Sequence, residues 1–176
     1  GTAAAAGSPM ATVLVIDDEF GIAEVIEMAL EDEGHRVVAA VNGEQGLERL
    51  AAAAAGAATA VDLVLLDYMM PILDGPGVLR AMRADPVLRG VPVVLMTSLD
   101  EATARRGCEG FVAFLRKPFR IEQLVRTVAE AVQARHPAHH DVAAARALGH
   151  ADLVAPPTFA VVIAQRAEVL AKRHTP

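Results

Sequence analysis

The stretch that decides the fold is Val61-Asp62-Leu63-Val64-Leu65-Leu66-Asp67-Tyr68-Met69-Met70-Pro71, which runs on to Asp74-Gly75. Its apolar centre, Val64 to Leu66, is uninterrupted, which is typical of a strand covered on both faces of a parallel sheet. Asp67 stands where this run stops, and in open α/β sheets ligands bind at the carboxyl ends of the strands. A lone Asp at such a place is as often a turn cap as a functional group. Other parts of the chain therefore have to decide its role.

The rest of the chain repeats the same alternation of apolar runs and helical patterns. Short apolar runs also occur at 12–16, 36–41, 91–96 and 111–115. Amphipathic patterns at helical spacing lie at about 22–30, 43–55, 76–84, 100–106 and 120–135. Five such alternations predict an α/β fold, with a doubly wound parallel sheet that carries helices on both faces.

Length and composition limit the possible classes of protein. The 176 residues fit one ordinary domain plus an appendage. A formal charge of −6 offers no broad electrostatic footprint, so we expect no direct nucleic acid binding and no membrane contact. No apolar run approaches the length of a membrane span. The single cysteine, Cys108, excludes an internal disulfide and favours a cytoplasmic location.

Polar residues follow four of the predicted strands, where a parallel sheet would bring them to one edge. Asp17 and Asp18 follow the first strand, Asp67 the third, Thr97 the fourth and Lys117 the fifth. Each residue alone is more often a helix-end, capping or surface residue, but their joint placement is specific. Crowded carboxylates repel one another, and a hard cation such as Mg²⁺ relieves this. With a hydroxyl and an ammonium as donors, the set predicts phosphoryl transfer to an Asp.

These residues resemble the receiver domain of two-component response regulators, the CheY-like family, over about 11–133. The resemblance implies a flavodoxin-like (βα)5 fold with a five-stranded sheet in the order 2-1-3-4-5. The motifs that carry it are Val15-Ile16-Asp17-Asp18-Glu19, Leu66-Asp67-Tyr68-Met69-Met70-Pro71 with Asp74-Gly75, Thr97-Ser98 and Lys117-Pro118-Phe119.

The resemblance also implies a phosphoacceptor and a Mg²⁺ site. Asp67 is expected to take a phosphoryl group from a sensor histidine kinase or a phosphotransfer protein. Asp18 and Asp67 are expected to bind Mg²⁺ directly, with the backbone carbonyl of Met69 as a third ligand. Asp17 would act largely through water. Such a chain is no enzyme in the usual sense, because it catalyses only its own phosphorylation and dephosphorylation.

A second group of residues is implied to read the phosphorylation state. Lys117 would contact the phosphoryl oxygens, and Thr97 would swing in to hydrogen-bond one of them. Phe114 occupies the switch aromatic position, although a plain core Phe is close to equally expected there. The Lys117-Pro118 bond would be cis. The resulting change of conformation would control a downstream protein target.

Two departures from the family pattern affect the outcome. The segment from Thr97 to Lys117 is about two residues shorter than is usual, so the helix near 100–106 is expected to be short. Dimerisation is possible in this family through that surface, and the short helix weighs against it. Met69 and Leu99 stand two residues after Asp67 and Thr97. Neither side chain can orient a hydrolytic water, so we predict that the phosphoryl group is not especially short-lived.

The chain ends have a different composition from the receiver-like part. Residues 1–9 are expected to be a cloning remnant or disordered, 10–135 to form the receiver domain, and 136–176 to be a linker and helical tail without its own core. The stretch 136–165 resembles a fragment of hot-dog-fold hydroxyacyl-thioester dehydratases. His139 would match the catalytic His of that family, but the expected Asp is missing, so no such activity is predicted.

One rival function uses the same chemistry. A Mg²⁺-dependent phosphohydrolase with an aspartyl-phosphate intermediate would also need a carboxylate nucleophile at Asp67. That class requires a second Asp two residues later, where this sequence has Met69. It also requires a substrate-binding cap, for which the sequence offers no segment. It is kept as the alternative.

Overall fold

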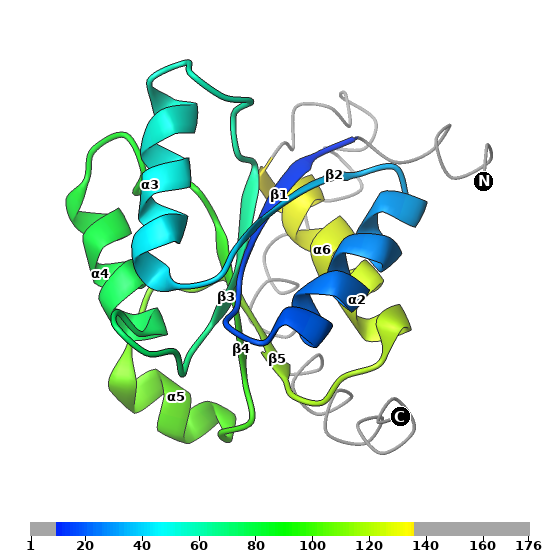
Figure 1. The fold of residues 1–176 in the computed structure, drawn as a ribbon. Helices are drawn as coiled ribbons and strands as arrows, with labels where there is room; N and C mark the ends of the chain where they lie inside the picture. The colour runs from blue at the N-terminus through cyan, green and yellow to red at the C-terminus, as the bar shows by residue number, and fades with distance from the viewer. Residues whose placement is uncertain (1–9, 136–176) are drawn as a thin grey trace, which may run out of the picture.

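A five-stranded parallel sheet lies between two layers of helices (Figure 1). This arrangement is seen in a computed structural model that describes residues 10–135. The strands are β1 (Thr12–Ile16), β2 (Arg36–Ala40), β3 (Leu63–Asp67), β4 (Val93–Thr97) and β5 (Ala113–Arg116). Their order is β2-β1-β3-β4-β5, and every neighbouring pair is parallel. The predicted α/β fold and strand order are therefore confirmed.

The helices divide between the two faces of the sheet (Figure 1). One face is covered by α2 (Phe20–Asp32) and α6 (Ile121–Arg135), and the other by α3 (Gly43–Ala54), α4 (Gly75–Ala84) and α5 (Glu101–Gly107). Side chains alternate across a strand, so Leu63 and Leu65 of β3 pack toward α2 and α6 while Val64 and Leu66 pack toward the other layer. This two-sided burial explains the uninterrupted apolar run.

Three helices begin at side chains that can cap them. The carboxylate or amide oxygens of Asn42, Asp74 and Asp100 accept hydrogen bonds from backbone N–H groups in the first turns of α3, α4 and α5, at 2.8 to 2.9 Å. Such oxygens satisfy donors that have no partner inside the helix. Glu19 holds the same position before α2 but makes no side-chain cap. Its carboxylate is free to bind elsewhere.

The observed elements differ in detail from the predicted ones. Strands β4 and β5 begin two residues later than the apolar runs, since Val91 and Phe111 belong to the preceding loops. Helix α5 has seven residues, as short as expected. No helix between residues 10 and 135 is long and apolar enough to cross a membrane. The predictions for 1–9 and for the tail at 136–176 lie outside the described residues.

Candidate functional site

The carboxyl ends of β1, β3, β4 and β5 meet at one edge of the sheet and bring the predicted site residues to it. The parallel register pairs Ile16 with Leu66 and Thr97 with Arg116, so the strands stop nearly level. Asp67 and Thr97 are the last residues of β3 and β4. Asp17 and Lys117 directly follow β1 and β5.

Lys117 is the centre of the site. Its Nζ donates to Asp17 Oδ2 at 2.8 Å and to Glu19 Oε1 at 3.1 Å. It also forms an ion pair with Asp67 Oδ1 at 3.3 Å. The Asp17 and Asp67 side chains are 0% and 6% exposed, whereas that of Glu19 is 60% exposed. One cation is thus shared by two buried carboxylates and one exposed carboxylate.

Burial and crowding change the ionisation of both aspartates. Burial, together with the charge of Asp17, raises the pKa of Asp67 to about 7, although Lys117 opposes the shift. Burial also raises the pKa of Asp17, against the stabilising hydrogen bond and charge of Lys117. A buried carboxyl group with such a pKa gains from any added positive charge. The site therefore favours binding of a cation.

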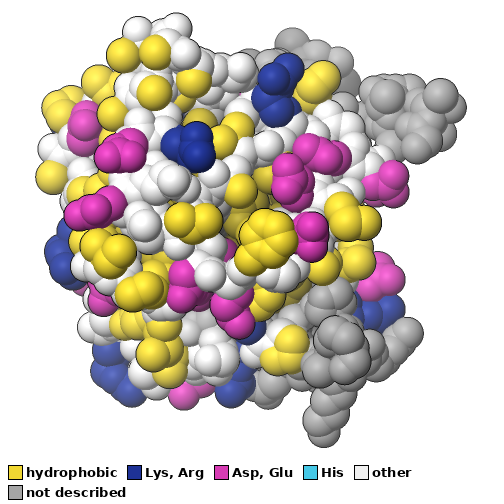
Figure 2. All heavy atoms as spheres, viewed as in Figure 1, with side chains coloured by type: hydrophobic (Ala, Val, Ile, Leu, Met, Phe, Trp, Pro, Cys, Tyr) yellow, Lys and Arg dark blue, Asp and Glu magenta, His cyan; other side chains and the backbone are white. Residues whose placement is uncertain are grey.

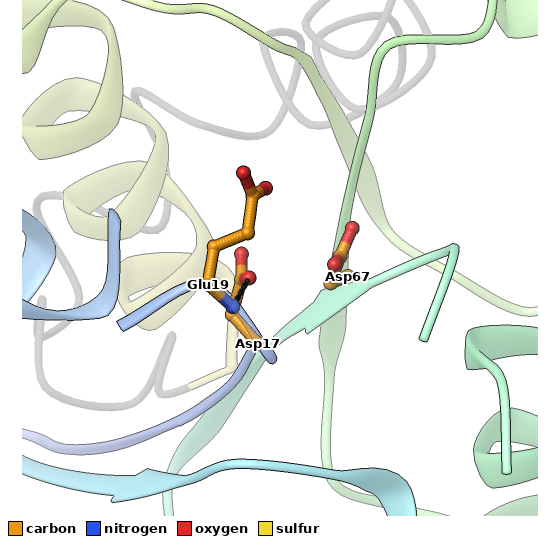
Figure 3. A group of neighbouring side chains, drawn as sticks. All are labelled: Asp17, Glu19 and Asp67. Carbon is orange, nitrogen blue, oxygen red and sulfur yellow. Dashed lines mark hydrogen bonds between the residues drawn. The ribbon is translucent and has the colours of Figure 1, made fainter. Parts of the chain in front are cut away.

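Carboxylate oxygens of Asp17, Glu19 and Asp67 lie within 4.8 Å of one another (Figure 3). Hard oxygen ligands of this kind suit Mg²⁺, which commonly takes one or two carboxylates and completes its shell with water and phosphate oxygens. Acidic side chains are also visible near the lower centre of the molecular face in Figure 2, where β1 leads into α2. The donor set and the excess of negative charge both fit the Mg²⁺ ion that the sequence resemblance implies.

Two of the predicted metal ligands, Asp18 and the backbone carbonyl of Met69, lie outside the group formed by Asp17, Glu19 and Asp67. Asp18 is exposed and is not part of this carboxylate group, although its charge raises the pKa of Asp67. Met69 lies in the loop after β3 with its side chain 61% exposed. Ligation by Asp18 and by the Met69 carbonyl stays a prediction. The sequence reasoning missed Glu19, and the signal for it was a third consecutive acid after β1.

Thr97 and Phe114 are both buried, Thr97 at the end of β4 and Phe114 within β5. The Thr97 hydroxyl accepts from the N–H of Leu99 at 3.1 Å, and the Thr97 carbonyl accepts from the N–H of Lys117 at 2.8 Å. Phe114 is wholly buried on β5, with its ring centroid 6.4 Å from that of Phe111. In this state Phe114 is a core residue, and its switch role stays a prediction. The Lys117–Pro118 bond is cis, as predicted.

The start of α4 is pressed against the end of β3, which positions the loop after Asp67. A Cβ atom on Gly75 would lie 2.6 Å from the carbonyl oxygen of Asp67 and 2.7 Å from the Cα of Tyr68. Real Cβ atoms do not approach backbone atoms so closely, so a side chain here would displace the Asp67 loop. The Asp-Gly pair at 74–75 therefore serves both the helix cap and this close approach.

Comparisons with known proteins agree with the fold and the motifs. The sequence matches the response regulator receiver domain over residues 13–129. The transcriptional regulatory protein YkoG of Bacillus subtilis is 37% identical over 123 residues, and the DNA-binding response regulator MtrA of Mycobacterium leprae is 36% identical over 123 residues. These matches cover 69% and 66% of this chain but 50% and 48% of those proteins. The chain thus spans about half the length of these curated relatives.

A solved structure gives the same result for the fold. The chemotaxis protein CheY4 of Vibrio cholerae superposes with a TM-score of 0.62 at 26% identity, covering 70% of this chain and 99% of that one. A second sequence match, to the dehydratase domain region of FAS1-like proteins, covers residues 120–175. Most of that match lies outside the described residues.

The prediction of no direct nucleic acid binding is contradicted by these relatives. MtrA is a DNA-binding response regulator, and YkoG is a transcriptional regulatory protein. The prediction used the net charge of −6 of this chain. Charge on one stretch of a protein does not limit the contacts of another stretch, and about half of each relative lies outside the matched region. The charge argument was therefore too broad.

Proposed function

The chain belongs to the response regulator receiver domain family of two-component systems, and on that basis we propose that Asp67 is its phosphoacceptor. The donor would be a phosphohistidine on a sensor histidine kinase or a phosphotransfer protein. The observation that carries the proposal is the placement of a buried carboxylate, Asp67, 3.3 Å from the ammonium of Lys117 at the carboxyl edge of the sheet. A downstream partner would read the phosphorylated state.

The transfer needs Asp67 in its ionised form. An Asp67 carboxylate oxygen attacks the phosphorus, the P–N bond to the donor histidine breaks, and its electron pair returns to the imidazole nitrogen. With the pKa of Asp67 raised to about 7, a large share of this group would be protonated at neutral pH without added positive charge. A Mg²⁺ ion held by the carboxylates would supply that charge and would neutralise the phosphoryl oxygens.

The other residues would divide the remaining tasks. Asp18 and Asp67, with the Met69 carbonyl, would hold the Mg²⁺ ion, and Asp17 would act largely through water. Lys117 would stabilise the charge that develops on the phosphoryl oxygens. All the residues named for these steps lie within 10–135, the part of the chain that the structure describes.

Conformational switching would begin at two buried side chains. Thr97 would exchange its hydrogen bond with Leu99 for one with a phosphoryl oxygen. Phe114 has no hydroxyl, so any inward–outward movement of its ring would depend on packing alone. It is fully buried in the unphosphorylated state.

The phosphoryl group is expected to persist beyond seconds. Met69 and Leu99 offer neither a carboxylate nor an amide to orient an attacking water. After removal of the donor, intact mass spectrometry over time should show slow loss of the adduct. Complete hydrolysis within seconds would contradict this expectation.

The deciding experiment is Mg²⁺-dependent labelling with acetyl phosphate, followed by intact mass spectrometry. One phosphate should add to the wild type and to Asp32→Asn, a control that changes an exposed acid at the end of α2. No phosphate should add to Asp67→Asn. Absence of an adduct in all three proteins, with Mg²⁺ binding intact, would refute the phosphoacceptor role. Rapid steady turnover of the donor would instead favour the phosphohydrolase alternative.

A further inference from the structure

Lys117 has no free donor in the unphosphorylated protein. A lysine ammonium carries three N–H donors, and three carboxylates surround this one. Their oxygens lie 2.8 Å (Asp17), 3.1 Å (Glu19) and 3.3 Å (Asp67) from Nζ. A new acceptor for Lys117 must therefore displace one of these contacts.

Glu19 and Asp17 hold Lys117 in different ways. Asp17 is anchored on both oxygens, because Oδ1 accepts from the Glu19 N–H at 2.8 Å while Oδ2 accepts from Lys117. Among the residues that the structure describes, Lys117 is the only partner of the Glu19 carboxylate. That carboxylate is also largely exposed, so water can replace Lys117 once the contact breaks. Releasing Asp17 instead would leave a buried charge unpaired, which is far more costly.

The Glu19 side chain binds Lys117 instead of capping the helix that Glu19 precedes. It is the N-cap residue of α2, where Ser, Thr, Asp and Asn are preferred because their short side chains reach the first turn. Glu19 makes no such cap, whereas Asn42, Asp74 and Asp100 cap α3, α4 and α5. In Figure 3 the Glu19 side chain runs alongside Asp17, across from Asp67.

We propose that Glu19 is a positioning residue that restrains Lys117 in the unphosphorylated protein and is released when a phosphoryl group on Asp67 binds Lys117. This inference rests on the proposed phosphoacceptor function. Phosphorylation turns the Asp67 carboxylate into an acyl phosphate, so the donor that Lys117 gives to Asp67 passes to a phosphoryl oxygen. The remaining phosphoryl oxygens are further strong acceptors, which compete with Asp17 and Glu19 for Lys117. Because Glu19 is the exposed partner, its contact is the one that breaks, and breaking it slows phosphorylation.

Three variants separate the contact from the charge. Glu19→Asp keeps the charge but withdraws the carboxylate by one methylene group, and Asp is a preferred N-cap residue that should preserve α2. Glu19→Gln removes the charge and keeps the length. Glu24→Gln removes the charge of an exposed residue further along α2 and serves as the control.

The rate of phosphorylation by acetyl phosphate at saturating Mg²⁺ measures the restraint. Glu19→Asp should react about two- to fivefold faster than the wild type, the range that the loss of one half-exposed ion pair allows. Glu24→Gln should react at the wild-type rate. A wild-type or lower rate for Glu19→Asp would overturn the proposal. So would acceleration in Glu19→Gln alone, because charge rather than contact would then be the cause.

A second measurement does not depend on phosphorylation. Lys117 and Lys172 are the lysines of the sequence, so lysine-selective isotope labelling gives few side-chain NMR signals. The Lys117 ε-methylene should be more mobile in Glu19→Asp than in the wild type or Glu24→Gln. Unchanged mobility would overturn the restraint. Absence of phosphorylation in every protein would instead refute the proposed phosphoacceptor function, and the NMR result would then decide the restraint alone.

Discussion

The two edges of the sheet use polar side chains in opposite ways. At the carboxyl edge, charged groups face one another, with Lys117 between Asp17 and Asp67. At the amino edge, polar side chains bind the backbone. Asp62 Oδ2 accepts from the N–H of Thr12 at 2.8 Å, and His35 Nδ1 accepts from the N–H of Ala11 at 3.3 Å.

Arg83 shows the amino-edge pattern most fully. Its guanidinium donates to the carbonyls of Arg89, Val91 and Gly110, which belong to the loops that lead into β4 and β5. Polar groups at this edge satisfy backbone groups and so stabilise the fold. At the carboxyl edge, unbalanced negative charge lowers stability but prepares a carboxylate for phosphoryl chemistry. Removing a polar side chain at the amino edge should therefore lower stability, whereas removing the charge of the buried Asp67 at the carboxyl edge should raise it.

The largest effect is expected at the amino edge. Arg83→Ala removes hydrogen bonds to three carbonyls and should lower the free energy of unfolding by about 2–3 kcal/mol. Arg80→Ala changes an exposed arginine one turn earlier in α4 and should have an effect of about 0.5 kcal/mol or less. Urea unfolding would measure both. Equal losses in the two variants would show that the carbonyl contacts do not stabilise the fold.

At the carboxyl edge, Asp67→Asn should stabilise the protein. Because burial raises the pKa of Asp67 to about 7, the ionised group is disfavoured in the folded state. This destabilisation is absent below the unfolded pKa of about 4, grows as the pH rises, and is complete above the folded pKa of about 7. We expect a gain of about 1–3 kcal/mol at pH 8 and none at pH 4, measured by urea unfolding without Mg²⁺. A loss of stability at pH 8 would contradict the contrast between the edges.

His35 provides a pH test of the amino edge. Burial lowers the pKa of His35, so the folded state favours the neutral ring, whose Nδ1 accepts from Ala11. The stabilisation is present above the unfolded pKa of about 6.5 and is lost as the pH falls through the lower folded pKa. His35→Asn keeps an acceptor without titrating and should be about 1 kcal/mol less sensitive to acidification from pH 7.5 to 5. Parallel pH profiles for the two proteins would refute the role of His35.

The smallest effect is expected at Thr97. Thr97→Val removes the acceptor for the N–H of Leu99, a group near enough to solvent to bind water instead, so a loss of about 0.5–1 kcal/mol is expected. Thr97→Ser keeps the hydroxyl and should lose less. Thermal unfolding of the pair measures the difference. A larger loss for Ser than for Val would mean that the methyl group, not the hydroxyl, matters.

The sequence predicted the elements well and the side-chain contacts less well. Apolar runs located all five strands because burial on both faces leaves a local pattern. Their carboxyl ends placed Asp67, Thr97 and Lys117 at one edge, since parallel strands end together. The pattern could not show that Arg83 binds carbonyls of two loops, because the farthest of these carbonyls, that of Gly110, lies 27 positions along the chain.

The sequence by itself determined the succession of strands and helices along the chain and the chemical groups that stand at the carboxyl edge of the sheet. Only the tertiary structure decided that Glu19, and not its neighbour Asp18, contacts Lys117. Consecutive residues at a strand-to-helix turn point in directions set by the backbone there. The cation shared by Asp17 and Glu19 is Lys117, which directly follows β5, 100 positions beyond Asp17. Composition and spacing record which groups are present, but packing decides which of them meet.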